Sequence, residues 1–245
     1  MTLSHLIFKK TYHVVALIGS GGKTTMIRTL ARENRSSQQV FISNTLNMER
    51  IPESEVDFID YNFREDYSLS EYTEPGVYVL AYDITPNNSM RGLPLEVLEK
   101  QVAHFDLSLI ECDESRQRPL KAWRHNEPLL LDATDMTLGI LDIASIGLPI
   151  SVDTVHNLDI FCDLTEKKVG DIITREDVKH LILDPSMMFR SARGKRVLFI
   201  NKAENPITLK YARDLGKEIA QAKGSPDIIV IGSLTDENYE LIKDT

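Results

Sequence analysis

Short runs of apolar residues recur along the chain, and most are separated by segments in which apolar and polar residues repeat at helical spacing. The runs are rich in β-branched residues, which predicts buried strands at 14–18, 39–43, 56–60, 77–83, 107–113, 136–143, 196–200 and 227–233. Helices are predicted at 25–35, 96–103, 174–183 and 209–222. In the helix at 174–183, Thr174 and Asp177 have the spacing of a capping box.

Strands that alternate with helices indicate an α/β fold of three layers, with a mostly parallel sheet covered on both faces. An acidic loop separates the runs at 56–60 and 77–83. We expect a single domain over 1–245, with a small helical insertion near 150–195. Ligands of such folds lie at the carboxyl ends of the strands, so polar residues that follow the apolar runs are candidate site residues.

A glycine-rich corner follows the first predicted strand and precedes a predicted helix. Glycines there allow backbone angles and close approaches that a side chain would block. The free N–H groups of the helix start attract phosphate, the lysine reaches the β and γ phosphates, and the first threonine hydroxyl can ligate magnesium. The predicted nucleotide-binding residues in this corner are Gly19, Ser20, Gly21, Gly22, Lys23, Thr24 and Thr25.

This corner is shorter than the common phosphate-binding loop, because Leu17 stands where that pattern needs a glycine six residues before the lysine. It is closer to the short loop of Mur-like ligases. The alternative is a tight turn between a strand and a helix, with Lys23 as a solvated residue of the first helical turn. The order of strand, glycines, Lys-Thr and helix favours a P-loop NTPase-like fold.

A second candidate segment follows the strand at 107–113. Glu111 and Asp113 are two residues apart, so in a strand they point the same way, whereas Cys112 points into the core. Paired carboxylates beside a phosphate loop suit magnesium, and we expect Asp113 to hold the ion with Thr24, while Glu111 acts behind it or as a base. Cations that follow could meet an anionic substrate or stabilise charge on a leaving phosphate: Arg116, Arg118 and Lys121. The alternative is a solvated loop of mixed charge.

A third candidate segment follows the strand at 196–200. Asn201, Lys202 and Glu204 have the Asn-Lys-x-acid layout with which guanine-nucleotide proteins read the base, although an aspartate is usual where Glu204 stands. The alternative is a polar turn. His125 and His156 are the remaining candidates. Neither has a second histidine at metal-ligand spacing, so a zinc site is not expected, and each reads locally as a surface or packing residue.

Composition restricts the class of protein. The chain has 245 residues, of which 42% are apolar and 27% charged, as in ordinary globular proteins. The net charge of −9 argues against nonspecific binding to nucleic acid or to an anionic membrane. No apolar run approaches the ~20 residues of a membrane span, and no signal peptide is evident. Two cysteines fifty residues apart fit a reduced cytoplasmic protein.

Together these segments resemble the YqeC family, accessory proteins for selenium-dependent molybdenum hydroxylases. The similar elements occur in the family's order at Gly19–Thr25, Ser43–Met48, Glu111–Ala122, His125–Pro128, Val155–His156 and Asn201–Glu204. Departures from the family pattern are Asn47 for histidine, Glu114 for glycine, an insertion in the His-Glu-Pro element, Asn157 for arginine and Glu204 for aspartate. The candidate substrate residues are Thr45, Arg116, Lys121, His125 and His156.

The sequence therefore predicts a protein that binds ATP or GTP with Mg²⁺, with Lys23, Glu111 and Asp113 as catalytic residues. It would hydrolyse the nucleotide in selenium and molybdenum cofactor maturation, with a molybdenum hydroxylase or its maturation proteins as partner. The first alternative is an ATP-dependent ligase or kinase that acts on a small molecule. The second is a non-catalytic, nucleotide-gated cofactor carrier or chaperone.

Overall fold

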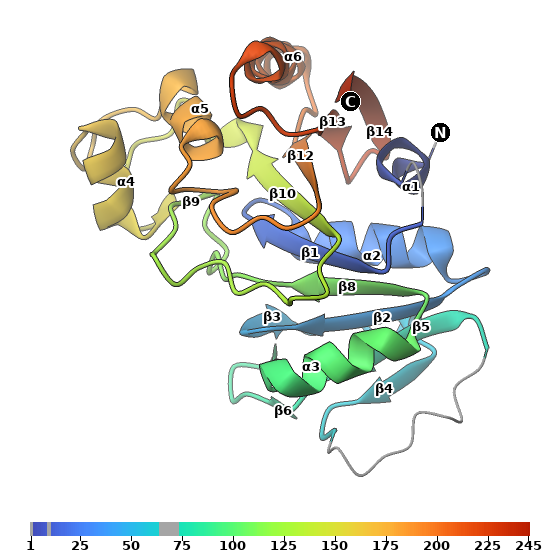
Figure 1. The fold of residues 1–245 in the computed structure, drawn as a ribbon. Helices are drawn as coiled ribbons and strands as arrows, with labels where there is room; N and C mark the ends of the chain where they lie inside the picture. Colours follow the sequence, from blue (N-terminus) through green and yellow to red (C-terminus); the bar gives the residue numbers. More distant parts are fainter. Residues whose placement is uncertain (1, 9–10, 64–73) are drawn as a thin grey trace.

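The structure is a computed structural model that describes residues 2–8, 11–63 and 74–245. In these residues a nine-stranded sheet forms the centre, in the order β14-β13-β12-β10-β1-β8-β2-β5-β4 (Figure 1). Neighbouring strands pair in parallel except β13 and β14, which pair antiparallel. The strands are β1 (Val14–Gly19), β2 (Gln39–Asn44), β4 (Phe58–Asp60), β5 (Gly76–Leu80), β8 (Leu107–Glu111), β10 (Met136–Asp142), β12 (Lys195–Asn201), β13 (Ile228–Ser233) and β14 (Asn238–Asp244).

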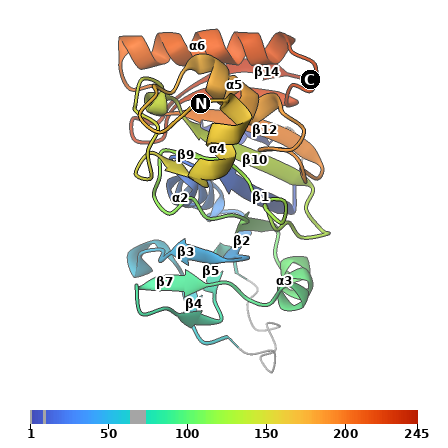
Figure 2. The same ribbon diagram turned by 90° about the vertical axis from the view of Figure 1, so that its left-hand side faces the viewer.

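Helices cover both faces of this sheet, which confirms the three-layer α/β prediction (Figures 1 and 2). Because side chains alternate across a strand, Ala16 and Ile18 of β1 pack into one core, and Val15 and Leu17 pack into the other. The first core is covered by α3 (Leu95–Gln101), α4 (Leu158–Thr165), α5 (Arg175–Leu183) and α6 (Pro206–Gln221), and the second by α1 (Leu3–Ile7) and α2 (Lys23–Asn34).

Two small sheets lie beyond the carboxyl ends of the central strands. One is antiparallel in the order β3-β7-β6 and the other pairs β11 with β9 in parallel. Short 3₁₀ helices complete the connections at Glu53–Glu55, Val102–His104 and Ile143–Ser145. The short strands are β3 (Asn47–Glu49), β6 (Asp83–Ile84), β7 (Ser89–Arg91), β9 (Leu120–Lys121) and β11 (Val155–His156).

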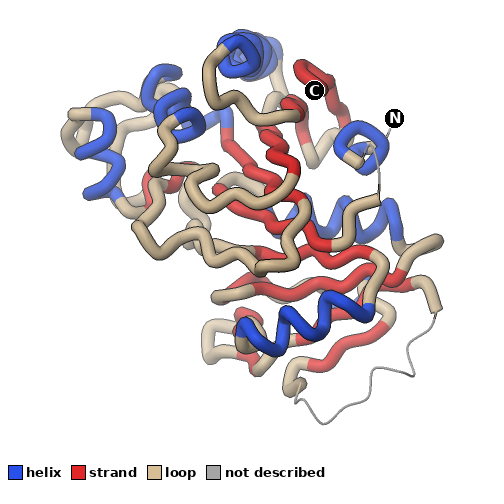
Figure 3. Tube along the Cα trace, viewed as in Figure 1, coloured by secondary structure: helices blue, strands red, loops and turns tan. Residues whose placement is uncertain are grey.

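Most predicted elements are present, with shifts at their ends (Figure 3). The capping box of α5 forms, with Thr174 and Asp177 as its two partners. Helix α6 begins at Pro206 rather than at 209, because the Asn205 side chain accepts from the N–H groups of Ile207 and Thr208. Strand β8 ends at Glu111, so the prediction that it continues to 113 was wrong.

The elements that were not predicted include α1, α4, the short strands β3, β7, β9 and β11, and the edge strand β14, so 227–233 is not the last strand. The side chains of β14 are half-buried or exposed, so the strand shows no apolar run. The segment near 150–195 contains α4 and α5. The acidic loop before β5 lies largely in 64–73, outside the described residues. No helix in the described residues is long and apolar enough to cross a membrane.

Candidate functional site

The turn between β1 and α2 forms the centre of the candidate site. Gly19 has φ +100°, and a Cβ atom there would lie 2.2 Å from the carbonyl oxygen of Ile140 on β10. Gly22 is the N-cap of α2 and has φ +136°, so the cap offers no side-chain acceptor to the first-turn N–H groups. These N–H groups are left for solvent or a ligand.

Hydrogen bonds fasten this turn to three neighbouring segments. The N–H of Ser20 donates to the carbonyl of Ile140 at 3.0 Å, and its hydroxyl donates to the carbonyl of Pro119 at 2.9 Å. The Asn201 side-chain amide donates to the carbonyl of Gly21 at 2.7 Å. The turn is therefore held by β10, by the loop after β8 and by the end of β12.

A cavity of about 1020 Å³ opens above the turn, at the carboxyl ends of the central strands. It brings together parts of all three segments that the sequence singled out, which lie as far as 180 residues apart. The cavity is lined by Gly21–Thr25, Asn47–Glu49, Thr85, Asn87–Ser89, Glu111, Glu114–Pro119, Asp142, Asn201, Lys202, Glu204, Leu234 and Thr235.

Lys23 lies at the floor of this cavity with only 5% of its surface exposed. Its ammonium donates to the carbonyl of Gly19 at 2.8 Å and lies 3.2 Å from Asp113 Oδ1 and 3.6 Å from Glu111 Oε1. Burial by itself would lower the pKa of Lys23, but the two carboxylates raise it above its ordinary value. The lysine is therefore charged, and the expectation that it is solvated on the first helical turn is excluded.

Asp113 is buried beneath the turn and does not line the cavity. Both of its oxygens accept from the N–H of Gly19, at 3.2 and 3.0 Å, and Oδ2 also accepts from Trp123 Nε1 at 2.7 Å. The Lys121 ammonium lies 3.6 Å from Oδ2. Burial alone would raise the pKa of Asp113, yet the cations Lys23 and Lys121 lower it. Asp113 is thus an internal anion that fastens the turn, and the geometry does not favour it as a direct metal ligand.

Of the two acids Glu111 and Asp113, only Glu111 faces the cavity. It is the last residue of β8, it is 7% exposed, and its Oε2 has no hydrogen-bond partner among the described residues. Burial raises the pKa of Glu111 to about 7, against the lowering effects of Lys23 and Thr24. An orphaned carboxylate oxygen beside the Thr24 hydroxyl is a donor set that fits Mg²⁺, which takes oxygen ligands and keeps several waters.

The segment after β12 lies at the same cavity. Asn201 Oδ1 accepts from the N–H of Leu234 at 3.1 Å, so both ends of this amide are engaged within the protein. Lys202 Nζ donates to Asp142 Oδ2 at 2.5 Å. Burial raises the pKa of Asp142, although Lys202 lowers it. The exposed Glu204 lines the cavity and accepts from the Ser233 hydroxyl at 3.4 Å.

Of the five candidate substrate residues, the structure places only Arg116 at this cavity. Lys121 is buried and lies 3.1 Å from Glu127 Oε2, and His125 is exposed outside the cavity. His156 is half-buried on β11, where burial and then the cations Lys121 and Arg116 lower its pKa.

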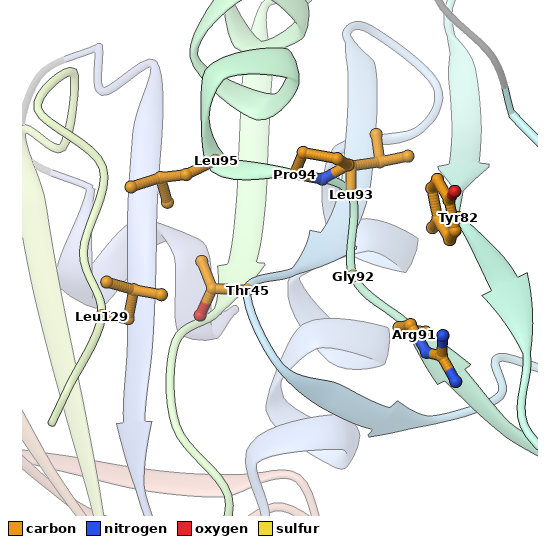
Figure 4. A pocket seen from close by; sticks show the side chains of 8 residues that line it. All are labelled: Thr45, Tyr82, Arg91, Gly92, Leu93, Pro94, Leu95 and Leu129. Atoms are coloured by element: carbon orange, nitrogen blue, oxygen red, sulfur yellow. The ribbon is translucent and has the colours of Figure 1, made fainter.

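Thr45 lines a separate pocket of about 310 Å³, shown in Figure 4. The polar Arg91 and Tyr82 lie at one end of this pocket, and Leu95 and Leu129 lie at the other with Thr45. Thr45 and Glu111 are in contact through the backbone, because the N–H of Thr45 donates to the carbonyl of Glu111 at 3.0 Å. The small pocket is therefore next to the larger cavity, but Thr45 does not line both.

Several site residues were missed by reasoning from the sequence. Asp142 ends β10 and could have been found as an acid at the end of a predicted strand, the signal that singled out Glu111. Trp123, the hydrogen-bond donor to Asp113, has no local signal of this kind. The described residues contain no group of three or more His, Cys, Asp or Glu side chains that could hold a metal ion.

The fold and the cavity define an α/β protein with a glycine-rich turn and a buried lysine at the carboxyl edge of a parallel sheet. The sequence model of the YqeC protein family matches residues 15–159, and the chain belongs to this family. The matched range includes the glycine turn and Glu111–Lys121 and ends before Asn201. The uncharacterized protein YqeC of Escherichia coli (strain K12) is 26% identical over 197 residues, which are 77% of this chain and 75% of that protein. No solved structure matches.

Proposed function

We propose that this protein binds a purine nucleoside triphosphate, ATP or GTP, with Mg²⁺ in the 1020 Å³ cavity and hydrolyses it. One observation carries the proposal. The uncapped start of α2 lines a cavity large enough for a nucleotide, and Lys23 is one of the residues at its floor. Backbone N–H groups at a helix start together with a lysine form the usual protein site for a triphosphate.

The residues of the cavity would divide the work as follows. The N–H groups of Lys23, Thr24 and Thr25 bind phosphate oxygens, and the Lys23 ammonium stabilises the charge of the transferred phosphoryl group. Thr24 and Glu111 would hold Mg²⁺, which when bound neutralises charge on the β and γ phosphates. Asp113 positions Lys23 and the Gly19 backbone from below.

Family membership is the basis for a wider proposal about the pathway. The resemblance to accessory proteins of selenium-dependent molybdenum hydroxylases supports the proposal that the nucleotide reaction serves the maturation of such an enzyme or of its cofactor. The partner would then be the hydroxylase or one of its maturation proteins. The cavity geometry supports the nucleotide step and is neutral about the pathway.

A transferase or ligase is the second candidate function. The cavity continues past Lys23 toward Asn47–Glu49 and Glu114–Arg118, so it has room for another reactant beside the phosphates. An enzyme of this kind would turn over nucleotide only when that reactant is supplied. Nucleotide binding with no turnover under any condition would instead favour the carrier or chaperone function.

The test is calorimetric titration of the purified protein with ATP and with GTP, each with and without Mg²⁺, followed by phosphate-release assays. We expect binding of at least one triphosphate and tighter binding when Mg²⁺ is present. Arg193→Gln serves as a control variant that should bind nucleotide like the wild type. It changes an exposed arginine outside the cavity that pairs with Asp132. If neither nucleotide binds the wild-type protein, the proposed function is wrong.

A further inference from the structure

The glycine turn lies in the middle of the cavity rather than at one end. Strand β1 is flanked by β10 on one side and by β8 and then β2 on the other. Toward β10, the lining comes from Asp142, Asn201, Lys202, Glu204, Leu234 and Thr235. Toward β2, it comes from what we call the arginine half, which comprises Asn47–Glu49, Thr85, Asn87–Ser89 and Glu114–Arg118. A nucleotide whose base lies toward β10 leaves the arginine half open.

Within the arginine half, the loop after β8 carries two arginines and one carboxylate. Arg118 donates to the carbonyls of Val152 at 2.6 Å and Arg116 at 2.8 Å, and it has no carboxylate partner among the described residues. Arg116 lies 3.8 Å from Glu114, with 70% of its side chain exposed. Asn47 also donates to Glu114, at 2.6 Å. A single carboxylate in this loop is therefore shared between an amide and Arg116, while Arg118 has none.

The remaining acid of this half is Glu49, which is exposed on β3. Apart from Met48, the other lining side chains are amides and hydroxyls, which can donate or accept hydrogen bonds: Asn47, Thr85, Asn87, Asn88, Ser89, Ser115 and Gln117. A guanidinium surrounded by neutral polar groups is a suitable environment for phosphate or carboxylate.

The backbone of this loop is held in an uncommon conformation. Arg116 and Gln117 both have positive φ, 49° and 59°, which non-glycine residues rarely adopt in succession. Such a conformation is unfavourable and persists where the surrounding structure requires it. Here the carbonyl of Arg116 accepts a hydrogen bond from the Arg118 side chain, which holds the backbone of Arg116 at the cavity.

Glu111 gives independent support for a ligand at this position. Strand β8 lies between β1 and β2, so its last residue stands between the phosphate-binding turn and the arginine half. Its Oε2 is buried and has no partner among the described residues. A buried carboxylate oxygen without a partner is costly unless a ligand, a water or an ion satisfies it.

We propose that the arginine half binds a second reactant, a small molecule that carries a phosphate or carboxylate group, with Arg116 as its anchor and Glu111 beside its reacting end. This inference rests on the proposed function, since the nucleotide is the first reactant. It keeps the proposed nucleotide site and favours the second candidate function, a transferase or ligase, and it explains why the cavity extends on both sides of Lys23.

The experiment is a calorimetric titration with inorganic phosphate and, separately, with succinate. The variants are Arg116→Gln, Lys23→Met, the double variant, and Arg193→Gln as an exposed control. We expect phosphate to bind the wild type at two sites, of which Lys23→Met removes one and Arg116→Gln weakens the other at least tenfold. Comparison of phosphate with succinate in Lys23→Met shows whether the Arg116 site prefers phosphate or carboxylate.

The outcomes separate this inference from the proposed function. If anion binding depends only on Lys23, the inference is wrong and the proposed nucleotide site is still supported. If anion binding depends only on Arg116, the second site is supported and the nucleotide site is not. Binding of neither anion to the wild type overturns the inference. If Lys23→Met does not fold, wild type and Arg116→Gln still decide it, because the inference requires the variant to lose a phosphate site.

Discussion

The ammonium of Lys23 lies 3.2 Å from Oδ1 of Asp113, beneath the glycine turn and almost out of reach of solvent. The same carboxylate holds the N–H of Gly19 and the indole N–H of Trp123. This pair therefore joins the proposed phosphate-binding group to the backbone that surrounds it. Changes at either residue should affect both the stability of the fold and the binding of nucleotide.

Lys23→Ala should reduce triphosphate affinity at least tenfold, about 1.4 kcal/mol. It should also lower the melting temperature, because it leaves the Asp113 carboxylate buried with one cation fewer. Calorimetry with nucleotide and thermal unfolding measure the two effects. The control is Arg32→Ala, an exposed residue of the same helix that pairs with Glu237. Unchanged affinity and hydrolysis in Lys23→Ala would exclude the phosphate site.

Asp113→Asn should weaken nucleotide binding with and without magnesium, because the turn loses the anion that fastens Gly19. Breaking a buried ion pair also destabilises a protein by about 3–5 kcal/mol. Glu111→Gln should instead leave metal-free binding close to normal and reduce magnesium-dependent turnover by about an order of magnitude, because the amide cannot supply the charged oxygen that would hold Mg²⁺. Turnover measured against magnesium concentration distinguishes the Asp113→Asn variant from the Glu111→Gln variant. A magnesium defect confined to Asp113→Asn would restore the assignment made from the sequence.

The stability of the protein should depend on the protonation of Glu111. Its pKa is about 7 in the folded state and 4.5 in the unfolded chain, so the folded state binds more protons between these values. The contribution of Glu111 to stability therefore falls as pH rises from about 4.5 to about 7 and is constant above. Urea unfolding should show Glu111→Gln gaining stability relative to wild type across this window. Glu49→Gln, an exposed change in the same cavity, should show no such gain.

Base preference tests the segment after β12. If Glu204 reads guanine, GTP should bind at least tenfold more tightly than ATP, about 1.4 kcal/mol, and Glu204→Ala should remove the difference. Asn201→Ala should weaken both nucleotides alike, since its amide holds the carbonyl of Gly21 and the N–H of Leu234. Equal affinity of the wild type for the two nucleotides would leave Asn201–Glu204 as a structural turn.

Gly19→Ala should destabilise the protein severely. The new Cβ atom would lie 2.2 Å from a backbone oxygen of β10 at φ +100°, so it meets both a clash and an unfavourable conformation. Gly147→Ala is the matched control, with φ +95° and no atom within 4 Å of the added carbon. Thermal unfolding of the two variants measures the effect of the close approach alone. Equal losses would show that the turn can move away from β10.

The sequence by itself determined the local units. The run 14–18, the glycines and Lys23 predict strand, turn and helix, because backbone sterics and helix periodicity act over a few residues. The alternation of strands and helices predicted the three layers, because each of these elements can be recognised from its local pattern. The edge strand β14 was not predicted, because its side chains are half-buried or exposed and its sequence therefore contains no apolar run.

The tertiary structure decided which of these units meet and which acid faces the cavity. Asn201 reaches Gly21 across 180 residues because β12 and β1 both flank β10, an order that no local pattern encodes. The roles of Glu111 and Asp113 depend on where β8 ends and on the donors around each carboxylate. The buried Asp113 carboxylate accepts hydrogen bonds from Gly19 and Trp123 and pairs with two lysines. Glu111 keeps a carboxylate oxygen without a hydrogen-bond partner at the cavity. Burial and partner geometry are properties of the packed chain, so only the fold could assign them.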